Sequence, residues 1–167
     1  DISRLGEAGK YFSNAKSTVC IDHHVGTDCF ADYDYIFPKA SSASELVYEV
    51  LDQDKISNDI AECLYTGMVH DTGVFQYSCT SAKTMNVAGR LMEMGIDFSD
   101  INHKLFSTKT QGQIRVEGFV GSNLKTAFSG RVAYASITLE DAAALGAKRE
   151  DMDTAVDVVR CAIGSEV

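Results

Sequence analysis

The chain has 167 residues, of which 45% are hydrophobic, and this is enough to build a buried core in one domain or two small ones. Its net charge of −9 argues against broad, sequence-independent binding to nucleic acid, which depends on many lysine and arginine contacts to phosphate. The five cysteines are scattered, so neither a zinc knuckle nor a disulfide framework is expected. The sequence contains no apolar run long enough for a membrane span, and we expect a cytoplasmic protein.

The apolar pattern predicts the secondary structure, and capping serines and glycines indicate where helices begin and end. The first part of the chain is expected to hold two short strands and three helices, at residues 18–22, 33–37, 41–51, 57–71 and 82–94. Further helical stretches are expected at 97–106 and 110–120. After Gly121 the pattern changes to a hairpin, 124–128 with 131–137, and two short helices, 139–146 and 153–163.

Asp22, His23 and His24 stand at the carboxyl end of the first predicted strand, where open α/β sheets place ligands and chemistry. Carboxylate and imidazole together suit Mn²⁺, Fe²⁺ or Zn²⁺. Adjacent side chains project in different directions, so one histidine could hold a metal while the other faces a substrate. For a His-His pair considered alone, an ordinary surface turn is the alternative interpretation.

A second motif, Asp71-Thr72-Gly73, ends the second predicted helix, and glycine is a suitable helix-ending residue. The carboxylate of Asp71 is therefore expected at a helix end, from which it can reach a shared site. The inner face of this helix is expected to consist of Ile60, Cys63, Leu64 and Met68. Asp-Thr-Gly also occurs in aspartic proteases, but those enzymes need two such motifs and this chain has one. For the motif alone, a capped helix end is the alternative.

Taken together, the two motifs resemble those of the DHH phosphoesterase superfamily. Residues Ser41 to Glu45, at a helix start, and Asp71 to Phe75 are similar to the branch of NrnA-type oligoribonucleases and pAp phosphatases. Asp1, followed by Ser3 to Gly6, resembles the acidic motif that precedes Asp-His-His in that branch. The family's opening His-x-x-x-Asp-x-Asp segment and closing Gly-Gly-Gly-His segment are not in the sequence, so we expect an internal piece of a longer protein.

The resemblance implies an α/β fold with a mostly parallel sheet flanked by helices, followed by the start of a smaller α+β domain. Residues 1–106 would be the carboxyl-terminal part of a DHH domain, and residues 107–121 a helical linker. Residues 122–167 would be the amino-terminal part of the DHH-associated (DHHA) substrate-binding domain. As a piece of its parent, the chain alone is expected to bind divalent metal weakly and to hydrolyse nothing appreciable.

The resemblance also implies a site for two Mn²⁺ ions, with Mg²⁺ or Co²⁺ as alternatives. Its ligands in this chain would be Asp1, His23 and Asp71. Asp22 would orient the ring of His23 without touching a metal, because metal-bound imidazoles usually donate their other N–H to a carboxylate or carbonyl. His24 would face the scissile phosphate as a hydrogen-bond donor or general acid.

Two further residues near these motifs have less specific roles. Arg4 is a candidate substrate contact, because the planar fork of arginine matches phosphate, although an exposed arginine is usually just solvated. His70 adjoins Asp71, but a neighbouring helical position points elsewhere, so we expect His70 to pack and not to approach the site.

For the whole protein, the resemblance implies a Mn²⁺-dependent phosphoesterase that hydrolyses short oligoribonucleotides, pAp or cyclic dinucleotides by a two-metal mechanism. The acidic balance favours such short substrates over long polymers. A second interpretation is an inorganic pyrophosphatase or exopolyphosphatase of the same superfamily, and a third is a non-catalytic regulatory or assembly module with the DHH fold. Neither a membrane partner nor broad duplex binding is expected, and a homodimer is compatible with the resemblance.

Overall fold

The structure is a computed structural model that describes residues 2–26 and 29–162, with the backbone alone at residues 2–4. The chain forms two compact units, Asp1–Leu105 and Phe106–Val167, and each is described by itself. The helix expected to act as a linker, α6 (Gln111–Ser122), packs against α8 (Ala155–Arg160) in the second unit. The domain boundaries given above stay a prediction.

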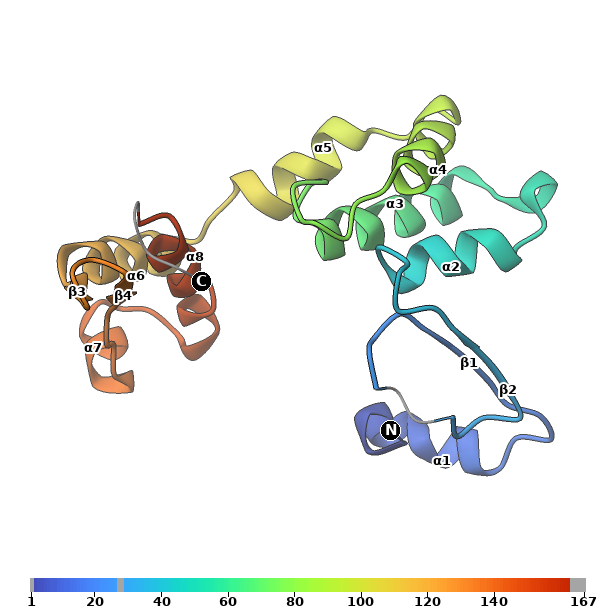
Figure 1. Ribbon diagram of the computed structural model, residues 1–167, viewed down its shortest axis with the longest axis horizontal. Helices are drawn as coiled ribbons and strands as arrows, with labels where there is room; N and C mark the ends of the chain where they lie inside the picture. The colour runs from blue at the N-terminus through green and yellow to red at the C-terminus, as the bar shows by residue number, and fades with distance from the viewer. Residues whose placement is uncertain (1, 27–28, 163–167) are drawn as a thin grey trace. The chain divides into compact units, whose positions relative to one another are not determined.

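The first unit begins with two short helical elements and a small sheet and continues with further helices (Figure 1). In chain order its elements are η1 (Ile2–Ala8), α1 (Gly9–Ser13), β1 (Val19–Asp22), β2 (Tyr33–Ile36), α2 (Ala43–Val50), η2 (Gln53–Lys55), α3 (Asn58–Thr72), α4 (Ala82–Glu93), α5 (Phe98–Asn102) and, at the boundary between the units, η3 (His103–Ser107). β1 and β2 pair in parallel, from Val19 opposite Tyr33 to Asp22 opposite Ile36. The parallel pair and the helices after it confirm the predicted fold class.

Side-chain caps set the helix ends near the site. Ser42, Ser57 and Ser81 each accept a hydrogen bond from a backbone N–H in the first turn of α2, α3 and α4. α3 stops at Gly73, whose backbone lies in the left-handed region (φ 55°, ψ 53°) that glycine adopts without steric cost. The predicted helix-ending glycine is therefore confirmed, and Asp71 lies in the last turn of the helix.

The core of the first unit is built largely from α3 and α4, with contributions from α2 and the segments between. Its buried apolar side chains are Tyr48, Ile56, Ala61, Leu64, Tyr65, Met68, Val69, Val87, Ala88, Leu91 and Ile96. The predicted inner face of α3 is partly wrong, because Ile60 is 39% exposed and Cys63 is exposed. Leu64 and Met68 are buried as expected, but the buried face is turned by about one residue position toward the packed neighbours.

α2 and α3 approach closely at Gly67, and this leads to a prediction about stability. A Cβ at residue 67 would lie 2.1 Å from Oγ and 3.0 Å from Cβ of Ser44, whereas one at Gly89 in α4 would meet nothing within 4 Å. We expect Gly67→Ala to destabilise the first unit by about 1–3 kcal/mol through overpacking. Gly89→Ala is the matched control and should stabilise by about 0.5–1 kcal/mol, because alanine is the better helix former.

Urea unfolding of the two variants measures this difference directly. The two substitutions are expected to change the free energy of unfolding in opposite directions. Both glycines lie inside helices and gain equally in helix propensity, so the difference between the variants reports the clash at residue 67. Equal stabilisation by both substitutions would contradict the close approach of α2 to α3 at Gly67.

The second unit combines helices with a short hairpin. Its elements are α6 (Gln111–Ser122), β3 (Lys125–Ala127), β4 (Val132–Tyr134), α7 (Leu139–Ala144), η4 (Arg149–Met152) and α8 (Ala155–Arg160). β3 and β4 are antiparallel and shorter than predicted, because Phe128 and Ser129 turn the chain with positive φ angles of 52° and 59°. Asp151 joins η4 to the start of α6, and hydrogen bonds from the Thr110 hydroxyl and the Lys148 N–H lower its pKa.

In the part of the chain that the structure describes, no helix combines the length and apolar character needed to cross a membrane.

Candidate active site

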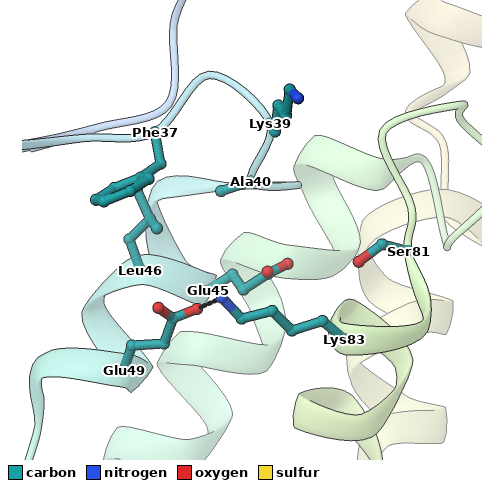
Figure 2. A pocket seen from close by; sticks show the side chains of 8 residues that line it. All are labelled: Phe37, Lys39, Ala40, Glu45, Leu46, Glu49, Ser81 and Lys83. Atoms are coloured by element: carbon teal, nitrogen blue, oxygen red, sulfur yellow. Dashed lines mark ion pairs between the residues drawn. The ribbon is translucent and has the colours of Figure 1, made fainter.

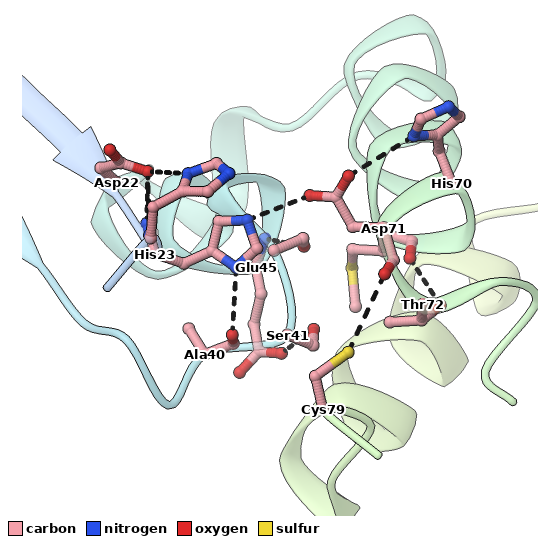
Figure 3. A network of polar contacts seen from close by, with 12 residues as sticks. Asp22, His23, Ala40, Ser41, Glu45, His70, Asp71, Thr72 and Cys79 are labelled. Atoms are coloured by element: carbon pink, nitrogen blue, oxygen red, sulfur yellow. Dashed lines mark hydrogen bonds and ion pairs between the residues drawn. The ribbon is translucent and has the colours of Figure 1, made fainter. Parts of the chain in front are cut away.

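The end of β1 and the end of α3 bring His23 and Asp71 together (Figure 3). Nε2 of His23 lies 3.4 Å from Oδ2 of Asp71, with the two side chains 19% and 36% exposed. The two motifs recognised in the sequence are thus neighbours in space, although they are far apart along the chain. An imidazole nitrogen and a carboxylate oxygen facing each other at a partly open position are a suitable pair of metal ligands.

The other nitrogen of His23 has its own partner. Nδ1 lies 3.3 Å from the carbonyl oxygen of Ala40, which follows β2. In the tautomer that carries its proton on Nδ1, the ring donates to this carbonyl and presents the lone pair of Nε2 toward Asp71. Metal-binding histidines are usually fixed in this way, by donation from the nitrogen that does not bind the metal.

Asp22 orients His24 instead of His23, which corrects the sequence-based assignment. Its Oδ1 accepts hydrogen bonds from the backbone N–H of His23 (2.7 Å) and His24 (3.1 Å) and lies 2.7 Å from Nδ1 of His24. The short carboxylate folds back over the turn that follows the strand, so it reaches the ring two residues on and not the adjacent one. The carbonyl of Ala40 takes the place expected for Asp22.

His24 lies beside His23 but presents a different edge. The two ring centroids are 4.7 Å apart and tilted by 59°, and the side chain of His24 is 56% exposed. With Nδ1 held by Asp22, its Nε2 remains to face a molecule bound next to the ring. The different directions of the adjacent histidines match the expected division of roles, although the roles themselves stay predictions.

The end of α3 presents Asp71 because Thr72 fixes the turn behind it. Thr72 is fully buried, and its hydroxyl donates to the Met68 carbonyl (2.6 Å) and accepts from the N–H of Phe75 (3.0 Å). Gly73 then turns the chain away from the helix. The motif Asp-Thr-Gly is therefore one exposed acid followed by two residues that hold its backbone.

His70 approaches Asp71, contrary to expectation. Its Nδ1 lies 3.4 Å from Oδ1 of Asp71, and its side chain is 73% exposed and therefore not packed. The carboxylate of Asp71 consequently lies between the imidazoles of His23 and His70. The thiol of Cys79 also donates to the backbone carbonyl of Asp71, at 3.8 Å. Sequence spacing gave no sign of the Cys79 contact, because it depends on the loop after α3.

The donor set agrees in part with a metal centre. Among the described residues, no three His, Cys, Asp or Glu side chains gather as a complete metal-binding cluster. His23 and Asp71 offer one nitrogen and one oxygen, which suits the first-row metals expected from the sequence. The predicted ligand Asp1 lies outside the described residues, and so does the side chain of Arg4.

Comparison with known proteins supports the family assignment. Residues 2–68 match the model of the DHH family, N-terminal domain. This part of the chain belongs to the DHH family. The match includes the Asp22-His23-His24 turn and most of α3, and it ends before His70 and Asp71.

The chain is also similar to curated relatives and to a solved structure. It is 32% identical over 126 residues to the bifunctional oligoribonuclease and PAP phosphatase NrnA of Bacillus subtilis (strain 168), covering 72% of this chain and 40% of the relative. Its identity to the NrnA of Thermus thermophilus is 28% over 149 residues, covering 88% of this chain and 44% of the relative.

A crystal structure of an exopolyphosphatase-related protein from Bacteroides fragilis superposes with a TM-score of 0.89 at 28% identity. The superposition covers 98% of this chain and 50% of that one. The chain thus spans half or less of the length of these three proteins. The predicted resemblance to the NrnA-type branch of the DHH family is confirmed.

Proposed function

We propose that the DHH chain carries the metal-binding side of a phosphoesterase that acts on short oligoribonucleotides or on pAp. The observation that carries this proposal is the pairing of His23 Nε2 with Asp71 Oδ2 beside the exposed His24. The names of the Bacillus and Thermus relatives, oligoribonuclease and PAP phosphatase, support the substrate class. A cytoplasmic location belongs to the same proposal, and the homodimer stays a prediction.

In this proposal His23 and Asp71 hold a divalent metal, with Mn²⁺ as the first choice and Mg²⁺ or Co²⁺ as alternatives. Such an ion, when bound, neutralises phosphate charge and activates the attacking water. The chain's own contribution begins with the Ala40 carbonyl, which keeps the His23 ring in the tautomer and orientation that a ligand needs. The buried turn at Thr72 keeps the carboxylate of Asp71 opposite that ring.

His24 would act on the substrate itself. Hydrolysis breaks the bond between phosphorus and the leaving oxygen, and this oxygen must gain a proton. As an imidazolium, His24 could donate that proton from Nε2 while its Nδ1–H remains on Asp22. Donation of this kind from a positioned side chain contributes typically about 10²–10⁴-fold to the rate.

The solved relative supports a second candidate function. The exopolyphosphatase-related protein of Bacteroides fragilis superposes on nearly all of this chain, so pyrophosphate or polyphosphate is a competing substrate. The net charge of −9 does not distinguish these substrates from short nucleotides, because bound divalent cations reverse the local sign of an acidic pocket.

Competition between substrates tests the proposal. With the full-length protein at fixed Mn²⁺ and salt, we expect kcat/KM to be higher for pAp and for short oligoribonucleotides than for a long single strand or pyrophosphate. A highest value for the long strand would point to a polymer nuclease, and a highest value for pyrophosphate to a pyrophosphatase. If no substrate turns over and Mn²⁺ does not bind, the chain belongs to a non-catalytic module.

A further inference from the structure

Glu45 is a buried carboxylate that the proposed chemistry does not use. It lies in the first turn of α2 and is 2% exposed. Its Oε2 accepts hydrogen bonds from the hydroxyls of Ser41 (2.5 Å) and Thr84 (2.8 Å). A glutamate at this position of a helix usually turns back to the N-cap backbone, but this one reaches across to α4.

A carboxylate in this position needs a physical reason, because an ionisable group is rarely fully buried without partners. The nearby cation Lys83 is paired with another acid, Glu49, on the next turn of α2 (Figure 2). The hydrogen bond to Glu49 raises the pKa of Lys83. Glu45 and this pair line the same cavity of about 240 Å³, yet the hydrogen bonds to Oε2 of Glu45 come from two hydroxyl groups.

The two hydroxyls connect Glu45 to the active site on one side and to α4 on the other. Ser41 directly follows Ala40, whose carbonyl oxygen lies 3.3 Å from Nδ1 of His23. Thr84 also belongs to the capping box that starts α4. A continuous set of contacts therefore runs from Thr84 of α4 through Glu45 and Ser41 to the peptide that orients His23. From His23 it continues to Asp71, and Figure 3 shows the part that runs from Glu45 to Asp71.

We propose that Glu45 is a positioning residue for His23, acting through Ser41 and the Ala40 carbonyl. The role of His23 as a metal ligand rests on the proposed function, but the orientation of its ring does not. Both hydroxyls donate to the same oxygen of Glu45, so this one atom links α4 to the segment after β2. When that atom is removed, Ser41 loses its acceptor and the Ala40 carbonyl can turn away from the imidazole.

The test uses the full-length protein with substitutions at three positions. Glu45→Ala and Ser41→Ala each break the set of contacts, and Ser41→Ala does so with the smaller disturbance to the core. Glu45→Gln is the conservative variant, because its amide oxygen can still accept from both hydroxyls. Glu49→Gln is the control on the same helix, one turn further along α2, because Glu49 bonds to Tyr35 and Lys83 and not to Ser41 or Thr84.

Two measurements report on His23, and the thermal unfolding midpoint of each variant is recorded as a third, to report on stability. Nitrogen-15 NMR of the imidazoles, recorded without metal, reports the tautomer of His23 and the hydrogen bond at Nδ1. Calorimetric titration with Mn²⁺ reports the affinity. We expect Ser41→Ala and Glu45→Ala to change the Nδ1 signal of His23 and to weaken Mn²⁺ binding about 10–100-fold, the usual effect of removing a partner behind a metal ligand.

Glu45→Gln should restore both readouts toward the wild-type values, and Glu49→Gln should leave both unchanged. A lower unfolding midpoint with an unchanged His23 signal in Ser41→Ala would overturn the proposal, because Glu45 would then serve the core alone. If the wild-type protein binds no Mn²⁺, the proposed function fails, and the NMR measurement still decides the role of Glu45.

Discussion

In the full-length protein, replacing Asp71 by asparagine is expected to remove Mn²⁺ binding and to lower phosphoester hydrolysis by at least about 10³-fold. The carboxylate faces Nε2 of His23 at 3.4 Å, and the amide of asparagine offers one neutral oxygen in place of two charged ones. Losing a ligand removes the charge neutralisation and the activation of water together, which is worth several kcal/mol at the transition state. His23→Ala should have the same effect through loss of the nitrogen ligand.

Asp59→Asn is the matched control for Asp71→Asn. Asp59 lies exposed in the first turn of the same helix, α3, so this change removes one negative charge from the same element. We expect it to leave Mn²⁺ affinity and turnover near the wild-type values. Calorimetric titration and steady-state kinetics give both numbers. Wild-type Mn²⁺ affinity in Asp71→Asn would rule out Asp71 as a ligand.

Replacing His24 by alanine is expected to leave the metal bound and to lower kcat about 10²–10⁴-fold, the usual contribution of a positioned proton donor. The different effects expected for His24→Ala and His23→Ala rest on geometry. The His24 ring is held by Asp22 and is 56% exposed, whereas the His23 ring is held by Ala40 and faces Asp71. The loss should be smaller for a substrate with a more acidic leaving group, since such a group needs less help from a proton donor.

The same kinetic and titration measurements on His103→Ala supply the control for His24→Ala, because His103 is an exposed histidine outside the site. We expect this change to have no effect on kcat or on Mn²⁺ affinity. If His24→Ala strips the metal while His23→Ala retains it, the roles assigned to the two histidines are reversed.

Much of the first unit could be predicted because local rules decide it. Serine caps and apolar periodicity placed α2, α3 and α4 within a few residues of their observed bounds, and Gly73 ends α3 as expected. The error on α3 has a tertiary cause. Ile60 and Cys63 are apolar enough to be core residues, but the neighbouring helices cover the face centred on Leu64 and Met68.

The candidate site could likewise be predicted only in part, because tertiary contacts decide the rest. Motif spacing could predict that His23 and Asp71 share a site, but it could not predict which carboxylate orients which ring. Asp22 serves His24 because its side chain folds back over its own turn, a matter of side-chain rotation that the sequence does not record. The bond from Thr84 to Glu45 joins residues 39 positions apart, and nothing in the local pattern around either residue indicates it.

The parallel pairing of β1 with β2 makes the order of folding matter for the site. Parallel strands cannot be joined by a tight turn, so their hydrogen bonds form only after the intervening chain has closed a loop. His23 leaves one strand and Ala40 follows the other, so their contact forms no earlier than the sheet itself. Helices form faster than such non-local pairs. When the complete chain refolds, it would carry the Asp71 carboxylate on a finished helix before it had an oriented imidazole, and metal capture would wait for the sheet.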